Sequence, residues 1–496
     1  MSGRRLLSRV ALIMLPVATA FAQDATNSPP GLYRERYRPQ FHYTVKKGWI
    51  NDPCGLVFYE GEYHLFNDHN PFGNKIPGEL GAKDRPPSRW SHAVSRDLVH
   101  WQELPIAILP DKLGAIYSGS GVVDAANTAG FARGDDKAIV LAYTSAGRPF
   151  SQSISYSTDR GRTWTPYKNN PVVPNQGLSI GERDPRVFWH DPTKKWIMVL
   201  FVKRGVARFF TSDDLKTWTH ASDFKGKGFY ECPDMFEIAL ESHSSDSPVT
   251  ENDNRAKTKW ILYDASFKYY VGSFDGKTFT PEVGPIRGDY GKNFYAAQTW
   301  TNTAQRRVQI AWMWLGKYPD MPFTQQMSFP CELKLISGPS GPRLYRYPIV
   351  EIAALRQESF VIEDRRLKVG ENALAGVSGD LFDIELSVRP GKAGQFTLRM
   401  HGQTVMFADN ELSAVGQSVP LVPIKGVVTL RILLDRTSLE VFANNGEVSM
   451  TSCIVPPHQE SPLALHAHGT DVHIESLTVH KLRSAWEGHL ERGGNK

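Results

Sequence analysis

STDRGRTW at residues 157–164 contains the pattern that decides the fold, a serine, then an aspartate, then an aromatic residue. Similar segments are SRDLVHW (95–101), SDDLKTW (212–218) and SFDGKTF (273–279), so the aromatic ends lie about 60 residues apart. Each segment predicts a polar turn between strands. A period of this size is typical of the four-stranded blades of a β-propeller. Unrelated Ser and Asp turns at hairpin ends are the alternative interpretation, because these residues favour turns everywhere.

Extension of this period in both directions predicts five blades over residues 41–338, after a lead segment at 23–40. The sequence GPSGP (338–342) predicts a linker at 339–349. Residues 350–483 alternate apolar and polar side chains in short runs, with an Asn-Asn-Gly turn at 444–446, which predicts a β-sandwich. The expected fold is therefore all-β, a five-bladed β-propeller followed by a C-terminal β-sandwich and a tail at 484–496.

The composition favours an ordinary globular protein of two domains. A chain of 496 residues is longer than one hydrophobic core usually serves, and 41% hydrophobic with 22% charged residues excludes a disordered or polytopic membrane protein. The net charge is +5, and three of the positive charges are arginines near the N-terminus. The rest of the chain is therefore close to neutral, so no nucleic acid partner is expected. The four cysteines are too few and too scattered for a disulfide framework or a zinc site.

The first 22 residues predict a signal peptide. Arg4 and Arg5 precede an apolar stretch at 10–21, and Ala20-Phe21-Ala22 supplies small residues for cleavage before Gln23. The stretch is shorter than the roughly 20 apolar residues that a membrane anchor needs. The protein is therefore expected to be exported, to the periplasm or the extracellular space, without a membrane partner.

Three short motifs place acidic side chains at the starts of the first, third and fourth repeat units. They are GWINDPCG (48–55) with Asp52, ERDPRVFW (182–189) with Asp184, and FYECPDMFEI (229–238) with Glu231. Asn51-Asp52-Pro53 predicts a tight turn, and Arg183 is expected to keep the adjacent Asp184 ionised. Each motif alone is also consistent with an ordinary turn. Their equivalent positions in three blades predict that the carboxylates converge at one end of the propeller axis.

The chain resembles the β-fructosidases of glycoside hydrolase family 32, the group of invertases, levanases and exo-inulinases, from about residue 41 to 482. The motifs that carry the resemblance are GWINDP (48–53), YHLF and HNPFG (63–73), SGSGVVD (118–124), RDP (183–185), EC (231–232), FYAAQTW (294–300) and DRTSLEVFANNGE (435–447). The family's fold coincides with the architecture that the repeats predict. By this resemblance Asp52 matches the nucleophile, Glu231 the general acid/base and Asp184 the transition-state stabiliser. The substrate-binding positions implied are Asn51, Asp68, Ser118, Arg183, Tyr295 and Trp314.

The implied reaction is retaining hydrolysis that releases fructose from the non-reducing end of a β-fructoside, either a fructan (levan or inulin) or sucrose. Retention requires the two carboxyl groups to lie about 5 to 5.5 Å apart. The pKa of Glu231 is expected to be raised by burial and that of Asp52 lowered in its turn. No cofactor and no metal are expected, because none of the acidic motifs has ligand spacing. The sequence indicates no oligomeric state.

Several residues depart from the family pattern. Cys54 replaces a usual Asn, Asn67 and Asp68 replace an aromatic residue and a Gln, and Ile76 stands near the position of a Trp that walls the fructose pocket. The extra carboxylate of Asp68 is expected to hinder the ionisation of Asp52. Trp314 could replace the missing wall, or could simply pack within a blade.

Two other functions are consistent with parts of the sequence. These departures would suit a carbohydrate-binding propeller whose catalysis is weakened or lost. STDRGRTW also matches the Asp-box turn of sialidases, but sialidases use a Tyr nucleophile and bind an anionic sugar with several arginines, of which only Arg183 is placed here.

Overall fold

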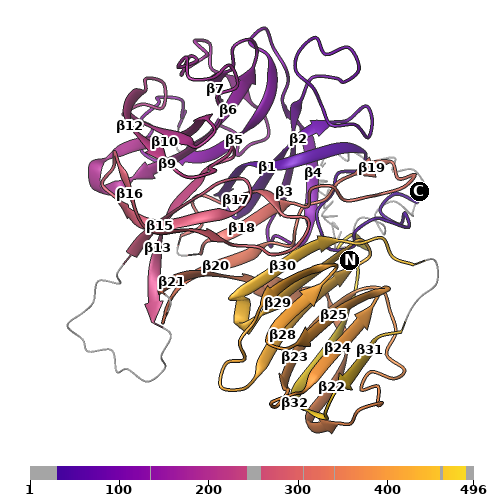
Figure 1. The fold of residues 1–496 in the computed structure, drawn as a ribbon. Coiled ribbons are helices and arrows are strands. Elements are labelled where there is room, and N and C mark those ends of the chain that lie inside the picture. Colours follow the sequence, from indigo (N-terminus) through magenta and orange to yellow (C-terminus); the bar gives the residue numbers. More distant parts are fainter. Residues whose placement is uncertain are drawn as a thin grey trace, which may run out of the picture.

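The computed structural model describes residues 31–134, 136–242, 258–304, 306–339, 341–457 and 462–487. Figure 1 shows two β-rich parts, the first coloured indigo to salmon and the second orange to yellow. The predicted signal peptide, the first residues of the lead segment and most of the predicted tail lie outside the described residues. In the described part of the chain, no helix has both the length and the apolar character needed to cross a bilayer.

The first part consists of five groups of antiparallel strands that follow one another along the chain. The first two groups are β1 (Gly48–Tyr59), β2 (Glu62–Asn70), β3 (Arg89–Ser95) and β4 (Trp101–Ile108), then β5 (Ala115–Asp124), β6 (Ala138–Ala146), β7 (Ser151–Ser157) and β8 (Thr165–Pro166). The next two are β9 (Arg183–His190), β10 (Lys195–Lys203), β11 (Val206–Ser212) and β12 (Thr219–Lys225), then β13 (Asp234–Ser242), β14 (Thr258–Tyr263), β15 (Lys268–Phe274) and β16 (Phe279–Arg287). The fifth contains β17 (Tyr295–Thr299), β18 (Val308–Trp312), β20 (Cys331–Gly338) and β21 (Gly341–Pro348). The short helix η1 (Asp191–Thr193) joins β9 to β10.

These groups are the blades of a five-bladed propeller. The first strands of the blades contact one another in a ring, β1 with β5, β5 with β9, β9 with β13, β13 with β17, and β17 with β1. Strand β19 (Phe323–Thr324), which follows β18 in the chain, pairs in parallel with the start of β1. The last blade is thereby tied to the first, and the ring closes without a free inner edge.

The repeated Ser and Asp residues form the turn between the third and fourth strand of a blade. In the first blade Asp97 Oδ1 accepts hydrogen bonds from the backbone N–H groups of Val99 and His100, at 3.0 and 2.8 Å. Asp159 and Asp214 bind the backbone of their own turns in the same way. Desolvation acts to raise the pKa of all three carboxyl groups, but these backbone bonds, together with side-chain hydrogen bonds such as those from His100 to Asp97 and Thr163 to Asp159, prevail and lower it. The repeat interpretation is therefore confirmed, because one local turn recurs in successive blades.

The second part is a sandwich of two antiparallel sheets. The six-stranded sheet contains β22 (Arg356–Leu367), β32 (Val472–Leu482), β23 (Phe382–Arg389), β28 (Val428–Asp435), β29 (Ser438–Ala443) and β30 (Val448–Cys453). The five-stranded sheet contains β27 (Gln417–Pro420), β26 (Glu411–Ala414), β25 (Gln403–Ala408), β24 (Gln395–Met400) and β31 (Ala464–His468). The short helices η2 (Val350–Leu355) and η3 (Asn444–Gly446) precede β22 and join β29 to β30. Inward-facing apolar residues of both sheets form one continuous core, as the alternating pattern predicts.

The segment 339–349, predicted as a linker, instead contributes strand β21. Its residues pair with β20 from Cys331↔Pro348 to Gly338↔Gly341, so GPSGP marks the close approach of two hydrogen-bonded strands and not a linker. Gly341 has φ +87°, which explains why a glycine is needed there. The chain then passes through η2 directly into the sandwich.

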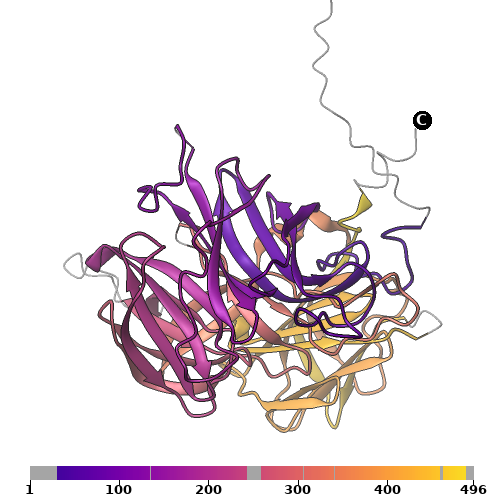
Figure 2. The ribbon, with the colours of Figure 1, turned by 90° about the horizontal axis from the view of Figure 1, so that it is seen from above.

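A buried network of ionisable groups joins the propeller to the sandwich. His42 contacts Asp435 through Nδ1 and Glu440 through Nε2, at 2.9 and 2.7 Å, and Arg346 pairs with Glu440 and Asp289. All of these side chains are buried. Figures 1 and 2 place the magenta third blade on the side of the propeller away from the sandwich, so this contact involves the other side of the ring.

Candidate active site

The three carboxylates predicted to converge lie near the starts of inner strands. Asp52 lies on β1, Asp184 is the second residue of β9, and Glu231 comes three residues before β13. Cys232, the neighbour of Glu231, connects them. Its backbone N–H donates to Asp184 Oδ2 at 2.9 Å, and its Sγ lies 3.4 Å from Asp52 Oδ2. Side chains from the first, third and fourth blades are therefore in contact at one end of the ring.

The nucleophile candidate lies inside a strand, so the prediction of a tight turn at Asn51-Asp52-Pro53 is wrong. The pairing of β1 with β2 shifts between Ile50 and Pro53, which leaves Asp52 at an irregularity of the ladder. Asn67 Nδ2 donates to the backbone oxygen of Asn51 at 3.1 Å, and Cys54 Sγ contacts the backbone oxygen of Asp52 at 3.2 Å. The carbonyl groups freed by the irregularity are thus bound by two of the residues that depart from the family pattern.

The Asp52 carboxyl group accepts a hydrogen bond from Ser118 Oγ at Oδ2, with a distance of 2.7 Å. Desolvation and the nearby Glu231 raise its pKa, although hydrogen bonds from Ser118, Asn51 and Cys232 act in the opposite direction. The prediction that the pKa of Asp52 is lowered is therefore wrong. The pKa is raised because the surrounding residues of the site exclude water from the Asp52 carboxyl group, whereas a turn at the protein surface would leave it solvated.

Asp184 is buried at the base of the site, with 2% of its surface exposed. Its backbone N–H donates to Thr144 Oγ1 at 2.9 Å, and Arg183 Nε lies 3.7 Å from its Oδ2. Burial raises its pKa; Arg183 acts to lower it, while Glu231 and Asp52 raise it further. Arg183 therefore favours the ionised form of Asp184, as the sequence predicts, but desolvation has the larger effect on its pKa.

Glu231 is held at both carboxyl oxygens. Arg183 Nη2 lies 2.5 Å from Oε2, and the hydroxyl of Tyr295 donates to Oε1. Arg183 Nη2 also donates to the Tyr230 hydroxyl at 3.2 Å. Arg183 thus lies between the two carboxylates, with charge-assisted hydrogen bonds to Glu231 and a longer ion pair to Asp184.

The backbone at these positions adopts an unusual conformation. Asp184 has φ +66°, Glu231 +31° and Cys232 +42°, and Ala296 beside Tyr295 has φ +50°. Residues other than glycine seldom adopt these values, which cost free energy unless the surrounding structure enforces them. This strain recurs where the third, fourth and fifth blades begin their inner strands. At each place it turns the side chain of the strained residue, or of the residue before it, into the site.

The remaining predicted substrate-binding residues surround the carboxylates. Ser118 Oγ lies 3.1 Å from Asp68 Oδ2, and Asn51 Nδ2 donates to the same oxygen at 3.2 Å. Trp314 is 42% exposed and its ring lies 5.0 Å from that of Tyr295. An exposed indole at the edge of the site favours contact with a ligand over simple packing within a blade.

Three residues of the site escaped prediction. Thr144 binds the Asp184 backbone, Cys232 links Asp184 to Asp52, and Trp90 donates its indole N–H to Asp68 Oδ1 at 3.1 Å. Cys232 could have been found from the FYECPDMFEI motif. Thr144 and Trp90 lie in β6 and β3 without a motif of their own, so only the three-dimensional contact identifies them.

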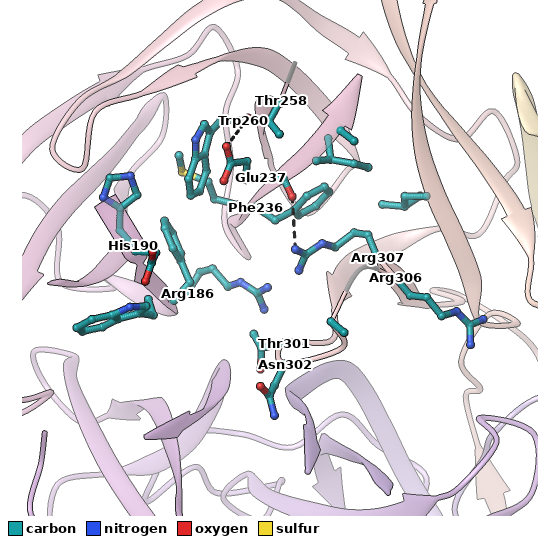
Figure 3. Close-up of a pocket in the computed structure, with 18 of the residues that line it drawn as sticks. Arg186, His190, Phe236, Glu237, Thr258, Trp260, Thr301, Asn302, Arg306 and Arg307 are labelled. Atoms are coloured by element: carbon teal, nitrogen blue, oxygen red, sulfur yellow. Dashed lines mark hydrogen bonds between the residues drawn. The ribbon is translucent and has the colours of Figure 1, made fainter. Parts of the chain in front are cut away.

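A cavity of about 940 Å³ lies at the other end of the inner strands and contains none of the three carboxylates. Its lining comes from the ends of β5 and β9, from β13, and from residues that follow β17. Figure 3 shows the guanidinium groups of Arg186 and Arg307 pointing into it, opposite Glu237. Arg186 pairs with Asp234 at 2.8 Å, and both side chains are buried. A buried ion pair is thus present at this end, in contrast to the carboxylate-rich site.

Comparison with known proteins gives matches through both parts of the chain. The models of the glycosyl hydrolases family 32 N-terminal domain and of the glycosyl hydrolases family 32 C terminal match residues 42–348 and 402–481. A levanase of Bacillus subtilis (strain 168) is 37% identical over 97% of this chain and 76% of its own length. An extracellular exo-inulinase of Aspergillus ficuum is 31% identical over 92% of this chain and 96% of its own. The crystal structure of exo-inulinase from Aspergillus awamori superimposes with a TM-score of 0.79 at 28% identity, covering 92% of this chain and 100% of that one.

Proposed function

The chain belongs to family 32 of the glycosyl hydrolases and releases fructose from β-fructosides, and from that premise we propose that it acts by a retaining mechanism at the site of Asp52, Asp184 and Glu231. The observation that carries the proposal is the contact chain from Asp52 through Cys232 to Asp184 and through Arg183 to Glu231. These residues come from three blades, and a purely structural role does not require three buried or half-buried carboxyl groups to gather around one arginine that pairs with two of them.

In the first step Asp52 attacks the anomeric carbon of the terminal fructosyl unit while Glu231 donates a proton to the leaving oxygen. The glycosidic bond breaks and a covalent fructosyl ester forms on Asp52. We assign the attack to Oδ1, because Ser118 and Cys232 both contact Oδ2. In the second step Glu231 takes a proton from water, the water oxygen bonds to the anomeric carbon, and the ester bond breaks to release fructose.

Asp184 and Arg183 bind hydroxyl groups of the fructosyl ring in this mechanism. The charge-assisted hydrogen bonds that Asp184 accepts strengthen as positive charge develops on the ring in the transition state. Asp184 is well placed for this role, because its carboxyl group is anchored at Oδ2 by the Cys232 N–H and its backbone by Thr144. Trp314 and Tyr295 supply an aromatic edge against which the sugar packs.

The proposed substrates are the terminal β-fructosides of levan or inulin, and sucrose. Purified protein is incubated separately with sucrose, inulin, levan and a sialoside, and the released sugars are separated. Free fructose without fructan oligomers is expected from the fructosides, with no product from the sialoside. Fructose from none of them would refute the proposed function. The sialidase alternative has no further support, since its matching segment STDRGRTW forms the β7–β8 turn found in other blades.

We also propose that the protein is exported, with residues 1–22 removed. The support is the basic start and the apolar stretch of the N-terminal sequence, together with the similarity to an extracellular exo-inulinase. N-terminal sequencing of the mature protein from the producing cell is expected to begin at Gln23. A mature chain that still carries Arg4 and Arg5 would contradict this proposal.

A further inference from the structure

A fourth carboxyl group, that of Asp68, lies beside the proposed nucleophile. Asp68 is on β2, is 5% exposed and has no role in the two proposed steps. Its Oδ1 accepts a hydrogen bond from the Trp90 indole at 3.1 Å, and its Oδ2 faces Ser118 Oγ and Asn51 Nδ2 at 3.1 and 3.2 Å. In the part of the chain that the structure describes, no Lys, Arg or His forms an ion pair with it.

The ionisable groups around Asp68 disfavour a second negative charge. Asp52 faces it from β1 and Asp184 from β9, and the titratable side chains of Cys54 and Tyr117 lie in the same environment. The site's arginine, Arg183, is engaged by Glu231 and Asp184. Burial, and then the charge of Asp52, raise the pKa of Asp68 well above its usual range.

Because Ser118 has a single hydroxyl proton, it limits how hydrogen bonds can be arranged among Ser118, Asp52 and Asp68. Ser118 Oγ lies 2.7 Å from Asp52 Oδ2 and 3.1 Å from Asp68 Oδ2, but a hydroxyl group has a single proton to donate. If both carboxyl groups were ionised, Ser118 could donate to only one of them. The other carboxylate oxygen would face the lone pairs of Ser118, although a second donor lies near each oxygen, Asn51 Nδ2 at Asp68 Oδ2 and Cys232 Sγ at Asp52 Oδ2. If Asp68 carries a proton on Oδ2, it donates to Ser118, and Ser118 donates to Asp52.

We propose that Asp68 is a positioning residue that acts in its neutral acid form, by donating a hydrogen bond to Ser118, which in turn donates to the nucleophile Asp52. This inference rests on the proposed function, in which Asp52 is the attacking group. The chain Asp68–Ser118–Asp52 holds Oδ2 of the nucleophile and leaves the ionised charge on Asp52. No proton is transferred along it during the reaction.

A consequence is that activity depends on a proton at Asp68. Ionisation of Asp68 at alkaline pH removes the donor, places a second anion beside Asp52 and frees Ser118 to rotate. The first step therefore slows on the alkaline side. For a substrate with an activated aryl leaving group the proton of Glu231 matters little to this step, so kcat/KM for an aryl β-fructofuranoside reports mainly on the remaining groups.

The test compares the wild type with Asp68→Asn, whose amide N–H donates from nearly the same position and cannot ionise. The ratio of kcat/KM, variant over wild type, is expected to rise with pH, by about tenfold per pH unit once Asp68 ionises in the wild type. Asp68→Gln, a longer amide, gives the same trend if Asp68→Asn folds poorly. Adding Asp68→Asn to Ser118→Ala is expected to change the profile less than in the wild-type background, because the hydrogen-bonded link to Asp52 is already absent and only the charge of Asp68 remains to be removed. A ratio that stays constant with pH would overturn the proposal.

A second readout does not depend on catalysis. A carboxyl group whose pKa is raised by folding destabilises the folded protein progressively as pH rises above its unfolded value of about 4, until its folded pKa is passed. The Tm of Asp68→Asn relative to wild type is therefore expected to increase with pH above about 4. A constant Tm difference would refute a protonated Asp68. If instead the Tm difference grows but no fructoside is cleaved, the proposed function fails and the protonation of Asp68 stands.

Discussion

The two ends of the propeller ring differ in how far their charged side chains form ion pairs. At the end that holds Asp52, four acidic side chains (Asp52, Asp68, Asp184 and Glu231) lie close together, and among the residues described only Asp184 and Glu231 are ion-paired, both with Arg183. At the other end the buried pair of Arg186 and Asp234 compensates itself, and Arg306 pairs with Glu332 and Glu351. The same strands, β9 and β13, supply both ends. The end that holds Asp52 thus has acidic groups without a paired cation that can serve chemistry, whereas the ion pairs of the far end contribute stability.

Asp52→Asn is expected to have the largest effect, because the amide cannot form the ester intermediate. The rate of fructose release should fall by about 10⁴-fold or more, while the Tm stays close to that of the wild type. Removal of a charge from a carboxylate-rich region is not expected to destabilise the fold. Substantial residual turnover by the purified variant would show that another group is the nucleophile.

Glu231→Ala is expected to affect substrates according to their leaving groups. Loss of the general acid should slow sucrose cleavage by about 10² to 10⁴-fold and slow an activated aryl β-fructofuranoside far less in its first step. Burst kinetics with the aryl substrate separate that step from the second, for which Glu231 is the base. Equal slowing of both first steps would argue against the acid role.

Arg186→Met tests the far end of the ring. The side chains of Arg186 and Asp234 are 1% and 0% exposed, so the variant leaves a buried carboxylate without its cation. The free energy of unfolding, measured by denaturant titration, is expected to fall by about 3 to 5 kcal/mol. The folded fraction should retain far more activity than Asp52→Asn.

The matched control for the far end is the double variant Arg186→Met with Asp234→Leu, which removes both charges. It should recover part of the lost stability, because no uncompensated charge stays buried. The recovery is incomplete, because Asp234→Leu also loses the hydrogen bonds that Asp234 Oδ2 accepts from the Tyr263 hydroxyl and the Thr299 N–H. A single variant as stable as the wild type would contradict a structural role for this pair.

A smaller effect is expected at the contact between propeller and sandwich. Burial acts to lower the pKa of His42, but its hydrogen bonds to Asp435 and Glu440 prevail and raise it to about 9. The stabilisation of the fold by protonated His42 is fully present below the unfolded pKa of about 6.5 and is lost as pH rises through about 9. The free energy of unfolding falls by roughly 3 kcal/mol over this range. The Tm of the wild type should therefore fall over this window more than that of His42→Gln, which cannot titrate. Parallel Tm curves would contradict a charged His42.

The blades could be predicted because their turns are local. Asp97 binds backbone groups two and three residues further along, so the signal recurs within a short segment of each repeat. The convergence of Asp52, Asp184 and Glu231 followed from the equivalence of the blades. GPSGP was misread because Gly and Pro residues occur both in linkers and where two paired strands approach each other, and pairing with β20 distinguishes them.

The electrostatics of the site could not be predicted from neighbours in sequence. The pKa of Asp52 depends on desolvation by other blades and on Glu231, and the Asp68–Ser118–Asp52 chain joins β2, β5 and β1. Arg183 is adjacent to Asp184 in sequence, yet its shortest ion pair is with Glu231. Contacts between blades therefore decide which groups are charged, and these contacts form only when the ring of blades is closed.

The anomeric configuration of the first fructose released tests the central claim most directly. Wild-type protein is mixed with sucrose in an NMR tube, and spectra are recorded before the product mutarotates. If Asp52 is the nucleophile and Glu231 the acid/base, the first product is β-fructofuranose, because two inversions at the anomeric carbon restore its configuration. Initial formation of the α-anomer would mean that water attacks directly between the two carboxyl groups, and the proposed roles would be refuted.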